Sequence, residues 1–322
     1  MKKVSVVMVF LNEKAEPLNT LVSMNRSADP STFEVIMMCD SPEYEFEQEV
    51  AKHSNAKLIK NLHRLGPHAS TTVGIHMAEA PVILVIDAHM RFCKDEWVEK
   101  IHEACMSDPT TLFCTRSYVL RDDMSPELLD PTRDFREVTD RYSVGARLKF
   151  YDPKIHELRP LQPEWIEKSN FIKEFNGRVP SLLGANYAMN TEHARKIRSF
   201  EGLKLYGFSE QFISIKNWMF GWECKGLDTV GIAHMFRSAP PFVSHSKYFI
   251  WNVLWTLHTL FYDNEEFIDK CYEVLHKDTA SMPGALEILN ENWDLIETYK
   301  SYFEPMRKMS SKEFLDKFNI VY

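Results

Sequence analysis

Two side chains that can bind a metal follow directly on a short apolar run. The run Val82–Ile86 ends in Asp87, and His89 stands two residues further on. A short run rich in β-branched residues favours a strand buried on both faces, and ligands of open α/β sheets collect at the carboxyl ends of such strands. Asp87 and His89 can therefore turn toward one divalent ion that holds a nucleotide diphosphate. The alternative is that Asp87 caps the next helix and that His89 is a solvated side chain.

The elements that must position these residues alternate between strand and helix signals along the N-terminal third of the chain. This alternation predicts right-handed βαβ crossovers and therefore an α/β fold with a mostly parallel sheet flanked by helices. The strands are expected at 4–11, 33–39, 57–62, 82–87 and 111–118, and the helices at 17–25, 45–52, about 70–78 and 95–105.

The rest of the chain divides into an irregular middle and a helical end. Five prolines between about 120 and 175 favour loops, edge strands and lids there. Regular structure is expected again at 179–190, followed by a helix whose N-terminal cap region is Thr191-Glu192. From about residue 247, aromatic residues recur at three- and four-residue spacing, which predicts a helix packed on the core. This aromatic series is Tyr248, Trp251, Trp255, His258 and Tyr262.

Composition and charge exclude several classes of protein. The 322 residues are 44% hydrophobic and 26% charged, which is typical of a globular protein. The net charge of −8 provides no general basic surface for nucleic acid. Six scattered cysteines without a C-x-x-C pair indicate reduced, buried thiols. No signal peptide and no apolar run of about 18 residues is found, so we expect a cytoplasmic protein without a membrane span.

Several segments share a resemblance to one family. Residues 5–13, SVVMVFLNE, resemble the opening strand of GT-A glycosyltransferases and are similar to the SVVIVFHNE opening of the polypeptide N-acetylgalactosaminyltransferases. Asn25-Arg26-Ser27 falls where that family often has the same tripeptide, and Asp87-Ala88-His89 resembles its D-x-H metal motif. Further along, residues 180–189 resemble its PTMAGGLFAI segment, Tyr206–Gln211 stands where it has WGGEN, and Ala233–Arg237 resembles its GHVFR. The matches keep their order from residue 4 to about 242.

The resemblance implies a GT-A fold and a metal-dependent transferase. Such an enzyme moves a hexose or N-acetylhexosamine from a UDP-sugar, similar to UDP-GalNAc, to an acceptor hydroxyl. It implies Asp87, His89 and His234 as the ligands of Mn²⁺ or Mg²⁺, and an ion that accepts mixed oxygen and nitrogen ligands suits this set. Taken alone, His234 would more commonly be a structural histidine.

Other site residues are also implied by the resemblance. Asp40 and Glu13 would contact the nucleoside, although Asp40 could instead form an Asx-turn and Glu13 could start a helix. Glu210 and Gln211 would be the catalytic pair that binds the sugar and the acceptor, which favours retention of configuration, whereas an inverting enzyme would use Glu210 as a general base. Glu210 could also be only an N-terminal helix acid. The remaining donor-site positions are Arg64, Gly184, Ala185 and Arg237.

The sequence also departs from the family. A donor-site arginine of the family is missing, and Arg64 or His68 would have to replace it. Phe208-Ser209 replaces a Gly-Gly pair, which narrows the space where the sugar would sit. These departures motivate the alternative of a catalytically degenerate sugar-nucleotide-binding protein. A nucleotidyltransferase is disfavoured because no Gly-rich, basic phosphate loop follows the first strand.

The acceptor stays open between a peptide Ser/Thr, a glycan and a hydroxymethylated base in nucleic acid. Nucleic acid would require that the basic residues of the irregular middle face the crevice, whereas their dispersal would favour a neutral or carbohydrate acceptor. We expect a nucleotide-sugar-binding half at 1–119, an acceptor half at 120–245 and a helical extension at 246–322. The basic residues concerned are Arg133, Arg136, Arg141, Arg147, Lys149, Lys154 and Arg159.

Overall fold

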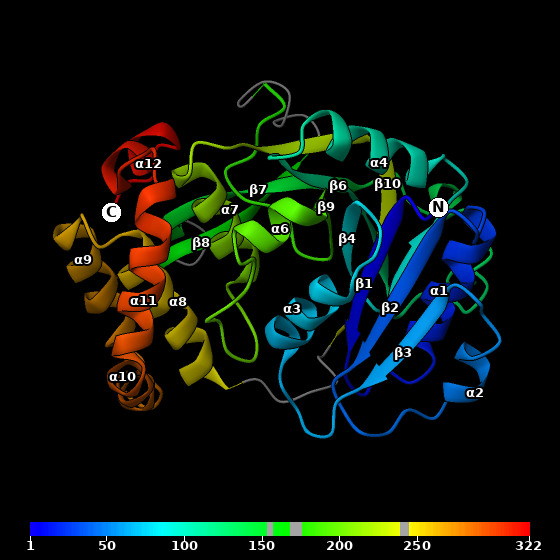
Figure 1. Ribbon diagram of the computed structural model, residues 1–322, viewed down its shortest axis with the longest axis horizontal. Coiled ribbons are helices and arrows are strands. Elements are labelled where there is room, and N and C mark those ends of the chain that lie inside the picture. The colour runs from blue at the N-terminus through cyan, green and yellow to red at the C-terminus, as the bar shows by residue number, and fades with distance from the viewer. Residues whose placement is uncertain (153–156, 168–175, 239–244) are drawn as a thin grey trace.

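One curved sheet runs through the molecule, with helices packed on both of its faces (Figure 1). The computed structural model describes residues 1–152, 157–167, 176–238 and 245–322. The strands lie in the order β3-β2-β1-β4-β9-β6-β10-β5, and β7 joins β6 to β8. Their bounds are β1 Val4–Phe10, β2 Phe33–Cys39, β3 Ala56–Lys60, β4 Val82–Asp87, β5 Met90–Phe92, β6 Leu112–Arg121, β7 Tyr142–Asp152, β8 Glu157–Glu167, β9 Asn186–Asn190 and β10 Cys224–Phe236.

The helices α8 to α12 gather at the end of the molecule opposite β1, β2 and β3 (Figure 1). Helices α1 and α4 cover one face of the N-terminal strands, and α3 covers the other. The bounds are α1 Glu16–Ser27, α2 Glu47–Val50, α3 Pro67–Met77, α4 Trp97–Ser107, α6 Thr191–Lys196, α7 Ser209–Met219, α8 Ser246–Leu260, α9 Glu265–Leu275, α10 Met282–Glu291, α11 Trp293–Phe303 and α12 Ser311–Lys317, with single 3-10 turns at Phe135–Glu137 and Glu304–Met306.

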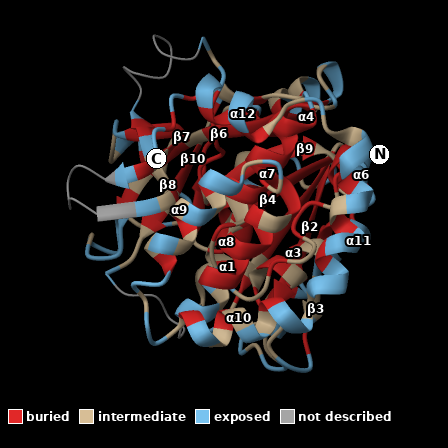
Figure 2. Cartoon of the chain, turned by 90° about the vertical axis from the view of Figure 1, so that its left-hand side faces the viewer, coloured by how far each residue is buried: buried red, intermediate tan, exposed pale blue. Residues whose placement is uncertain are grey.

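The central strands form because their side chains are apolar on both sides. Successive residues of a strand point to opposite faces, so β1 contributes Val6 and Met8 to one core and Val7 to the other. Every residue of β2 is buried, as expected for a strand covered on both faces. The central strands are accordingly coloured as buried in Figure 2.

The parallel order predicted for the N-terminal strands is confirmed. Strands β3, β2, β1 and β4 all run parallel. Beyond β4 the sheet is mixed, because β9 runs antiparallel to β4 and β6, and β5 runs antiparallel to β10. The sheet therefore changes direction next to β4, where the metal-binding residues are expected.

The proline-rich middle contains more regular structure than loops alone. β7 and β8 pair as an antiparallel hairpin beside β6, which confirms the expected edge strands. Pro163 stands opposite Leu148, and Pro160 also lies inside β8. A proline is tolerated there because β8 pairs only with β7, so one side of the strand needs no N–H donor.

Two expectations for the C-terminal half have different outcomes. The cap of α6 is Asn190 and not Thr191-Glu192, because the Asn190 side chain accepts hydrogen bonds from the Glu192 and His193 amides. The predicted aromatic helix is confirmed as α8, and its Trp251 and Trp255 are fully buried.

All six cysteines are buried and free of disulfides, as the sequence predicts. Within the described ranges, no helix is both long and apolar enough to cross a membrane.

Candidate active site

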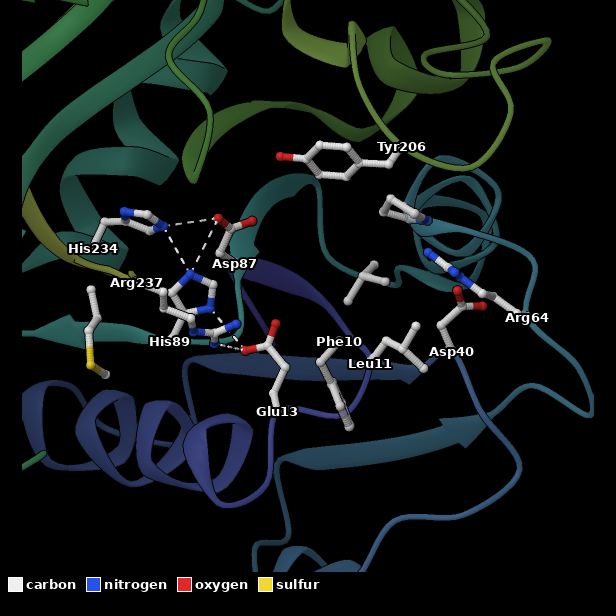
Figure 3. Close-up of a pocket in the computed structure, with 13 residues that line it drawn as sticks. Phe10, Leu11, Glu13, Asp40, Arg64, Asp87, His89, Tyr206, His234 and Arg237 are labelled. Carbon is white, nitrogen blue, oxygen red and sulfur yellow. Dashed lines mark hydrogen bonds and ion pairs between the residues drawn. The ribbon is translucent and has the colours of Figure 1, made fainter. Parts of the chain in front are cut away.

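Three side chains that could hold a metal ion converge at the carboxyl end of β4 (Figure 3). Asp87 ends β4, and the turn that follows leads into β5, where Met90 pairs with His234 of β10. This pairing brings His89 Nε2 within 3.0 Å of His234 Nε2. Asp87 Oδ2 lies 3.2 Å from His234 Nε2 and 3.9 Å from His89 Nε2. The residues proposed as ligands thus come together although 145 positions separate His89 from His234.

Glu13 fixes the orientation of His89. Its buried carboxylate lies 2.9 Å from His89 Nδ1 and also pairs with the Arg237 guanidinium. A carboxylate only accepts, so His89 Nδ1 donates to it, and Nε2 of His89 faces Asp87 and His234. Glu13 is therefore a partner behind a candidate metal ligand, and the first-turn acid of α1 is Glu16 instead.

The turn that carries His89 is held from α1. The Thr20 hydroxyl donates to the Ala88 carbonyl at 2.8 Å, and the Met90 amide donates to the Thr20 hydroxyl at 2.9 Å. Thr20 is fully buried. Sequence reasoning missed it, and a polar residue on the buried face of an amphipathic helix is the signal that could have indicated it.

The charges of the cluster favour a cation. Desolvation raises the pKa of Asp87, but the hydrogen bond with His234 and the charges of His89, His234 and Arg237 outweigh it and lower that pKa to about 2. Burial lowers the pKa of His234 despite the neighbouring Asp87. Burial raises the pKa of Glu13, but the contacts with His89 and Arg237 together lower it by more, so the net shift of this pKa is downward. Metal binding needs an ionised carboxylate and unprotonated imidazole nitrogens, and the lowered pKa values of Asp87 and His234 favour these states for the two residues.

The donor set fits a divalent ion. A neutral imidazole nitrogen and a carboxylate oxygen can each present a lone pair to a divalent ion. Ligand atoms about 2 Å from one ion are about 3 Å apart in an octahedral site. The separations of 3.0 and 3.2 Å match that spacing.

A cavity of about 420 Å³ extends from this cluster along the ends of β1 and β2. Glu13, Asp40, Arg64 and Arg237 line it together with the three candidate ligands. Asp40 does not form the Asx-turn considered from the sequence. Its carboxylate accepts the amide hydrogens of Leu65 and Gly66 at 2.8 and 2.9 Å. Asp40 thus holds the loop that carries Arg64, and both line the cavity (Figure 3).

His68 cannot supply the charge of the missing family arginine. Its ring is buried beside Phe200, and burial lowers the pKa of His68 to about 4, against a hydrogen bond with the Lys204 backbone. His68 is therefore neutral near pH 7. Arg64 lines the cavity and is the remaining candidate for that role.

A second cavity, of about 470 Å³, adjoins the first at Asp87, Tyr206 and His234. Glu210, Gln211, Gly184 and Ala185 line it, so four further predicted site residues do share one cavity. Glu210 stands in the first turn of α7 and also lines the cavity. It therefore fits both interpretations from the sequence, an N-terminal helix acid and a site residue. Burial and the nearby Asp87 raise the pKa of Glu210, although the Ser209 hydroxyl donates to its carboxylate at 2.9 Å.

Two residues with a Cβ atom occupy glycine-like backbone positions in this cavity. Ala185 has a φ of 90° and Phe208 a φ of 70°, and both are buried. The left-handed region is costly for residues with a Cβ atom, and such residues persist where their surroundings hold them. The Ala185 carbonyl accepts the Asp87 amide at 3.0 Å, which links this backbone to a candidate ligand.

Ala185→Gly is expected to stabilise the protein by about 0.5–1 kcal/mol, because glycine adopts a positive φ without the clash of a Cβ atom. Thermal or denaturant unfolding measures the change. The matched control is Ala188→Gly, in β9 and equally small, which should destabilise by about 1 kcal/mol because that position is an ordinary strand position. Destabilisation by both variants to the same extent would contradict the strain at Ala185.

The basic residues of the middle segment do not form one face on the crevice. Arg133 pairs with Glu137, and Arg136 pairs with Asp134. Arg147 and Lys149 both pair with Glu164. Of the remaining residues in that group, Arg141 and Arg159 are exposed, and Lys154 lies outside the described residues. None of the described residues of this group lines either of the two cavities.

Comparison with known proteins agrees with this geometry. Residues 5–153 match the model of glycosyl transferase family 2. Polypeptide N-acetylgalactosaminyltransferase 4 of Caenorhabditis elegans is 21% identical over 246 residues, which are 75% of this chain and 40% of that protein. Polypeptide N-acetylgalactosaminyltransferase 9 of Homo sapiens is 22% identical over 259 residues, 77% of this chain and 40% of that protein. The chain thus spans about two fifths of the length of these relatives.

Solved structures show the same fold. The crystal structure of GalNAc-T7 with UDP, GalNAc and Mn²⁺ superposes with a TM-score of 0.72 at 17% identity, over 98% of this chain and 57% of that one. The structure of Staphylococcus aureus TarS 1-349 with UDP-GlcNAc gives a TM-score of 0.53 at 15% identity, over 80% of this chain and 65% of that one. The GT-A fold and the resemblance to the catalytic domains of polypeptide N-acetylgalactosaminyltransferases are confirmed.

Glu13→Gln is expected to weaken Mn²⁺ binding about 10- to 100-fold, because the partners behind metal ligands orient them and raise their basicity. Isothermal titration with MnCl₂ measures the affinity without any substrate. The control, Glu45→Gln, changes an exposed acid after β2 and should leave the affinity unchanged. Equal Mn²⁺ affinities of Glu13→Gln and the wild type would show that metal binding does not depend on the contact between Glu13 and His89.

Proposed function

We propose that this chain, with its glycosyl transferase family 2 domain and GT-A fold, is a metal-dependent glycosyltransferase that uses a UDP-sugar. The observation that carries the proposal is the convergence of Asp87, His89 and His234 where the two cavities meet. A metal there would lie between a nucleotide in the first cavity and a sugar in the second. The proposed halves 1–119 and 120–245 then both contribute ligands, with 246–322 as a helical extension.

Each part of the donor has candidate partners. Asp40 and Glu13 line the first cavity and are proposed to contact the nucleoside, and Arg64 and Arg237, which line it too, would supply positive charge for the diphosphate. Asp87, His89 and His234 would hold Mn²⁺ or Mg²⁺, which as a Lewis acid would neutralise the charge that develops on the departing diphosphate. Gly184, Ala185 and Glu210 surround the space for the sugar.

The transfer exchanges one C–O bond for another. The bond from the anomeric carbon to the β-phosphate oxygen breaks, and UDP leaves with the electron pair. The acceptor oxygen forms the new bond to the anomeric carbon, and its proton passes to the departing phosphate. We propose retention of configuration, with Glu210 and Gln211 binding sugar and acceptor. Proton NMR of the first product reads the anomeric configuration directly, and an inverted product would make Glu210 the general base instead.

The acceptor that the second cavity favours is an uncharged hydroxyl compound. The titratable side chains that line this cavity are Asp87, His68, Tyr187, Tyr206, Glu210 and His234, and none of these is a lysine or an arginine. A polyanionic acceptor would find no lysine or arginine among the described residues of this cavity to offset its phosphates. A carbohydrate or a peptide hydroxyl requires no such charge.

UDP release tests the proposed function. The wild type is incubated with Mn²⁺ and UDP-GalNAc, UDP-GlcNAc, UDP-glucose or UDP-galactose, with and without glycan, peptide and hydroxymethylated-DNA acceptors. Metal-dependent release of UDP from at least one donor is expected, and EDTA should remove it. Donor binding without any turnover would support the degenerate binding protein, and no binding of any UDP-sugar would contradict both proposals.

A further inference from the structure

The segment 203–208 has no regular secondary structure and contributes Tyr206 to the lining of both cavities and Gly207 and Phe208 to that of the second. Its Tyr206 is 51% exposed and lines both cavities, opposite Asp87 in Figure 3. Phe208 immediately precedes α7, whose second residue is Glu210. The segment therefore carries Tyr206 to both cavities and leads directly into the first turn of α7, where Glu210 stands.

The backbone of the segment is strained. Leu205, Gly207 and Phe208 have φ values of 46°, 99° and 70°. Each non-glycine residue in this region costs about 1–3 kcal/mol, and such a conformation persists only where surrounding contacts hold it. A Cβ atom on Gly207 would lie 2.5 Å from the Phe249 ring, so the segment also packs closely on α8.

Asn252 of α8 supplies the contacts that hold the segment. Its side chain is fully buried. Its Oδ1 accepts the Lys204 amide at 2.7 Å, and its Nδ2 donates to the Lys204 carbonyl at 3.0 Å and to the Gly207 carbonyl at 2.8 Å. One amide group thus pairs with both backbone groups of Lys204, as a neighbouring strand would, and also with the far end of the segment. The preceding Trp251 adds a hydrogen bond to the Gly202 carbonyl at 3.0 Å.

We propose that Asn252 is a positioning residue, through which helix α8 fixes the Lys204–Gly207 segment and thereby sets Tyr206 and Glu210 for transfer. This inference rests on the proposed function. Asn252 touches neither cavity, so it acts only through the segment. The metal cluster is built from β4, β5 and β10 and has separate supports in Glu13 and Thr20. Loss of Asn252 should therefore affect transfer and not metal binding.

Asn252→Asp tests the proposal with little change in shape. The new oxygen replaces both N–H donors and faces the Lys204 and Gly207 carbonyls, so acceptors oppose acceptors. We expect kcat for transfer to fall about 10- to 100-fold, because displacements of about 1 Å have effects of this size. The KM for the UDP-sugar and the Mn²⁺ affinity should change less than about twofold. Asn252→Ser removes the same contacts without an added carboxyl and serves where Asn252→Asp does not fold.

The matched control is Thr256→Val, one turn further along α8. Thr256 is equally buried, but its hydroxyl donates to the Asn252 carbonyl within the helix and does not reach the segment. The Asn252 variants and Thr256→Val should all lower the melting temperature, whereas only the Asn252 variants should lower kcat. If Asn252→Ser keeps the kcat of the wild type, or if Thr256→Val lowers kcat equally, the positioning role is wrong.

Hydrogen exchange separates this inference from the proposed function. The Lys204 amide is expected to exchange at least tenfold faster in Asn252→Ser and at the wild-type rate in Thr256→Val. This measurement tests the contact between Asn252 and the segment even if the wild type transfers no sugar. Absence of transfer by the wild type would contradict the proposed function alone. Unchanged exchange at Lys204 in Asn252→Ser would show that Asn252 does not hold the segment.

Discussion

His234→Ala is expected to lower metal-dependent turnover of the UDP-sugar by at least about 10³-fold, which corresponds to about 4 kcal/mol of transition-state stabilisation. The variant removes one of three converging ligand atoms and leaves His89 Nε2 without its neighbour at 3.0 Å. The remaining pair should bind Mn²⁺ much more weakly. Titration with MnCl₂ and UDP release measure the two effects separately, and Asp87→Ala should behave in the same way.

His276→Ala is the control for this experiment, because His276 is an exposed histidine at the end of α9. It should keep wild-type metal affinity and turnover. Excess Mn²⁺ should restore part of the activity of His234→Ala if the variant still folds and lacks only affinity. Full metal-dependent activity in both His234→Ala and Asp87→Ala would contradict the proposed metal centre.

Glu210→Gln is expected to lower kcat about 10²- to 10⁴-fold, the range for a group that assists proton transfer or charge stabilisation.

Glu210→Gln should also raise the free energy of unfolding at neutral pH, by about 1 kcal/mol. Burial and Asp87 raise the pKa of Glu210, so the folded state holds the Glu210 proton more tightly than the unfolded chain does. That contribution to stability is therefore lost as the pH rises through the raised pKa. Glutamine does not titrate, so the difference in the free energy of unfolding between Glu210→Gln and the wild type should grow as the pH rises over the same interval.

Melting curves of Glu210→Gln and the wild type at acidic and neutral pH measure this difference. Glu192→Gln is the matched control, because Glu192 is an exposed acid in the first turn of α6. That variant should lose a few tenths of a kcal/mol through the helix dipole and keep full activity. If Glu210→Gln behaves like Glu192→Gln, then Glu210 is only a helix acid.

The sequence predicted most of the N-terminal fold because its signals are local. The apolar run before Asp87 specifies a strand buried on both faces, and the apolar run that ends at Cys39 specifies another. Cap residues were harder to identify. Asn190 and Thr191 are both plausible caps in sequence, and only the backbone shows that Asn190 bonds to the amides of α6.

The candidate site was predicted in part. Asp87 and His89 stand two positions apart, so their spacing alone suggested a shared ion. His234 entered only through the resemblance of its segment, because nothing in the sequence specifies that β5 pairs with β10. The role of Glu13 behind His89 was not predicted, since the contact joins two loops that fold together only when β1 and β4 are neighbours.

By itself, the sequence determined the types of the ligand atoms, the strands that precede them and the family resemblance, because all three depend on residue identity and short-range periodicity. The tertiary structure decided which groups meet and in which charge state. Burial makes His68 neutral and raises the pKa of Glu210, and desolvation is a property of the packed molecule. The contact between Asn252 and the segment 204–207 belongs to the same class, because it needs α8 to pack on a loop far from it in the sequence.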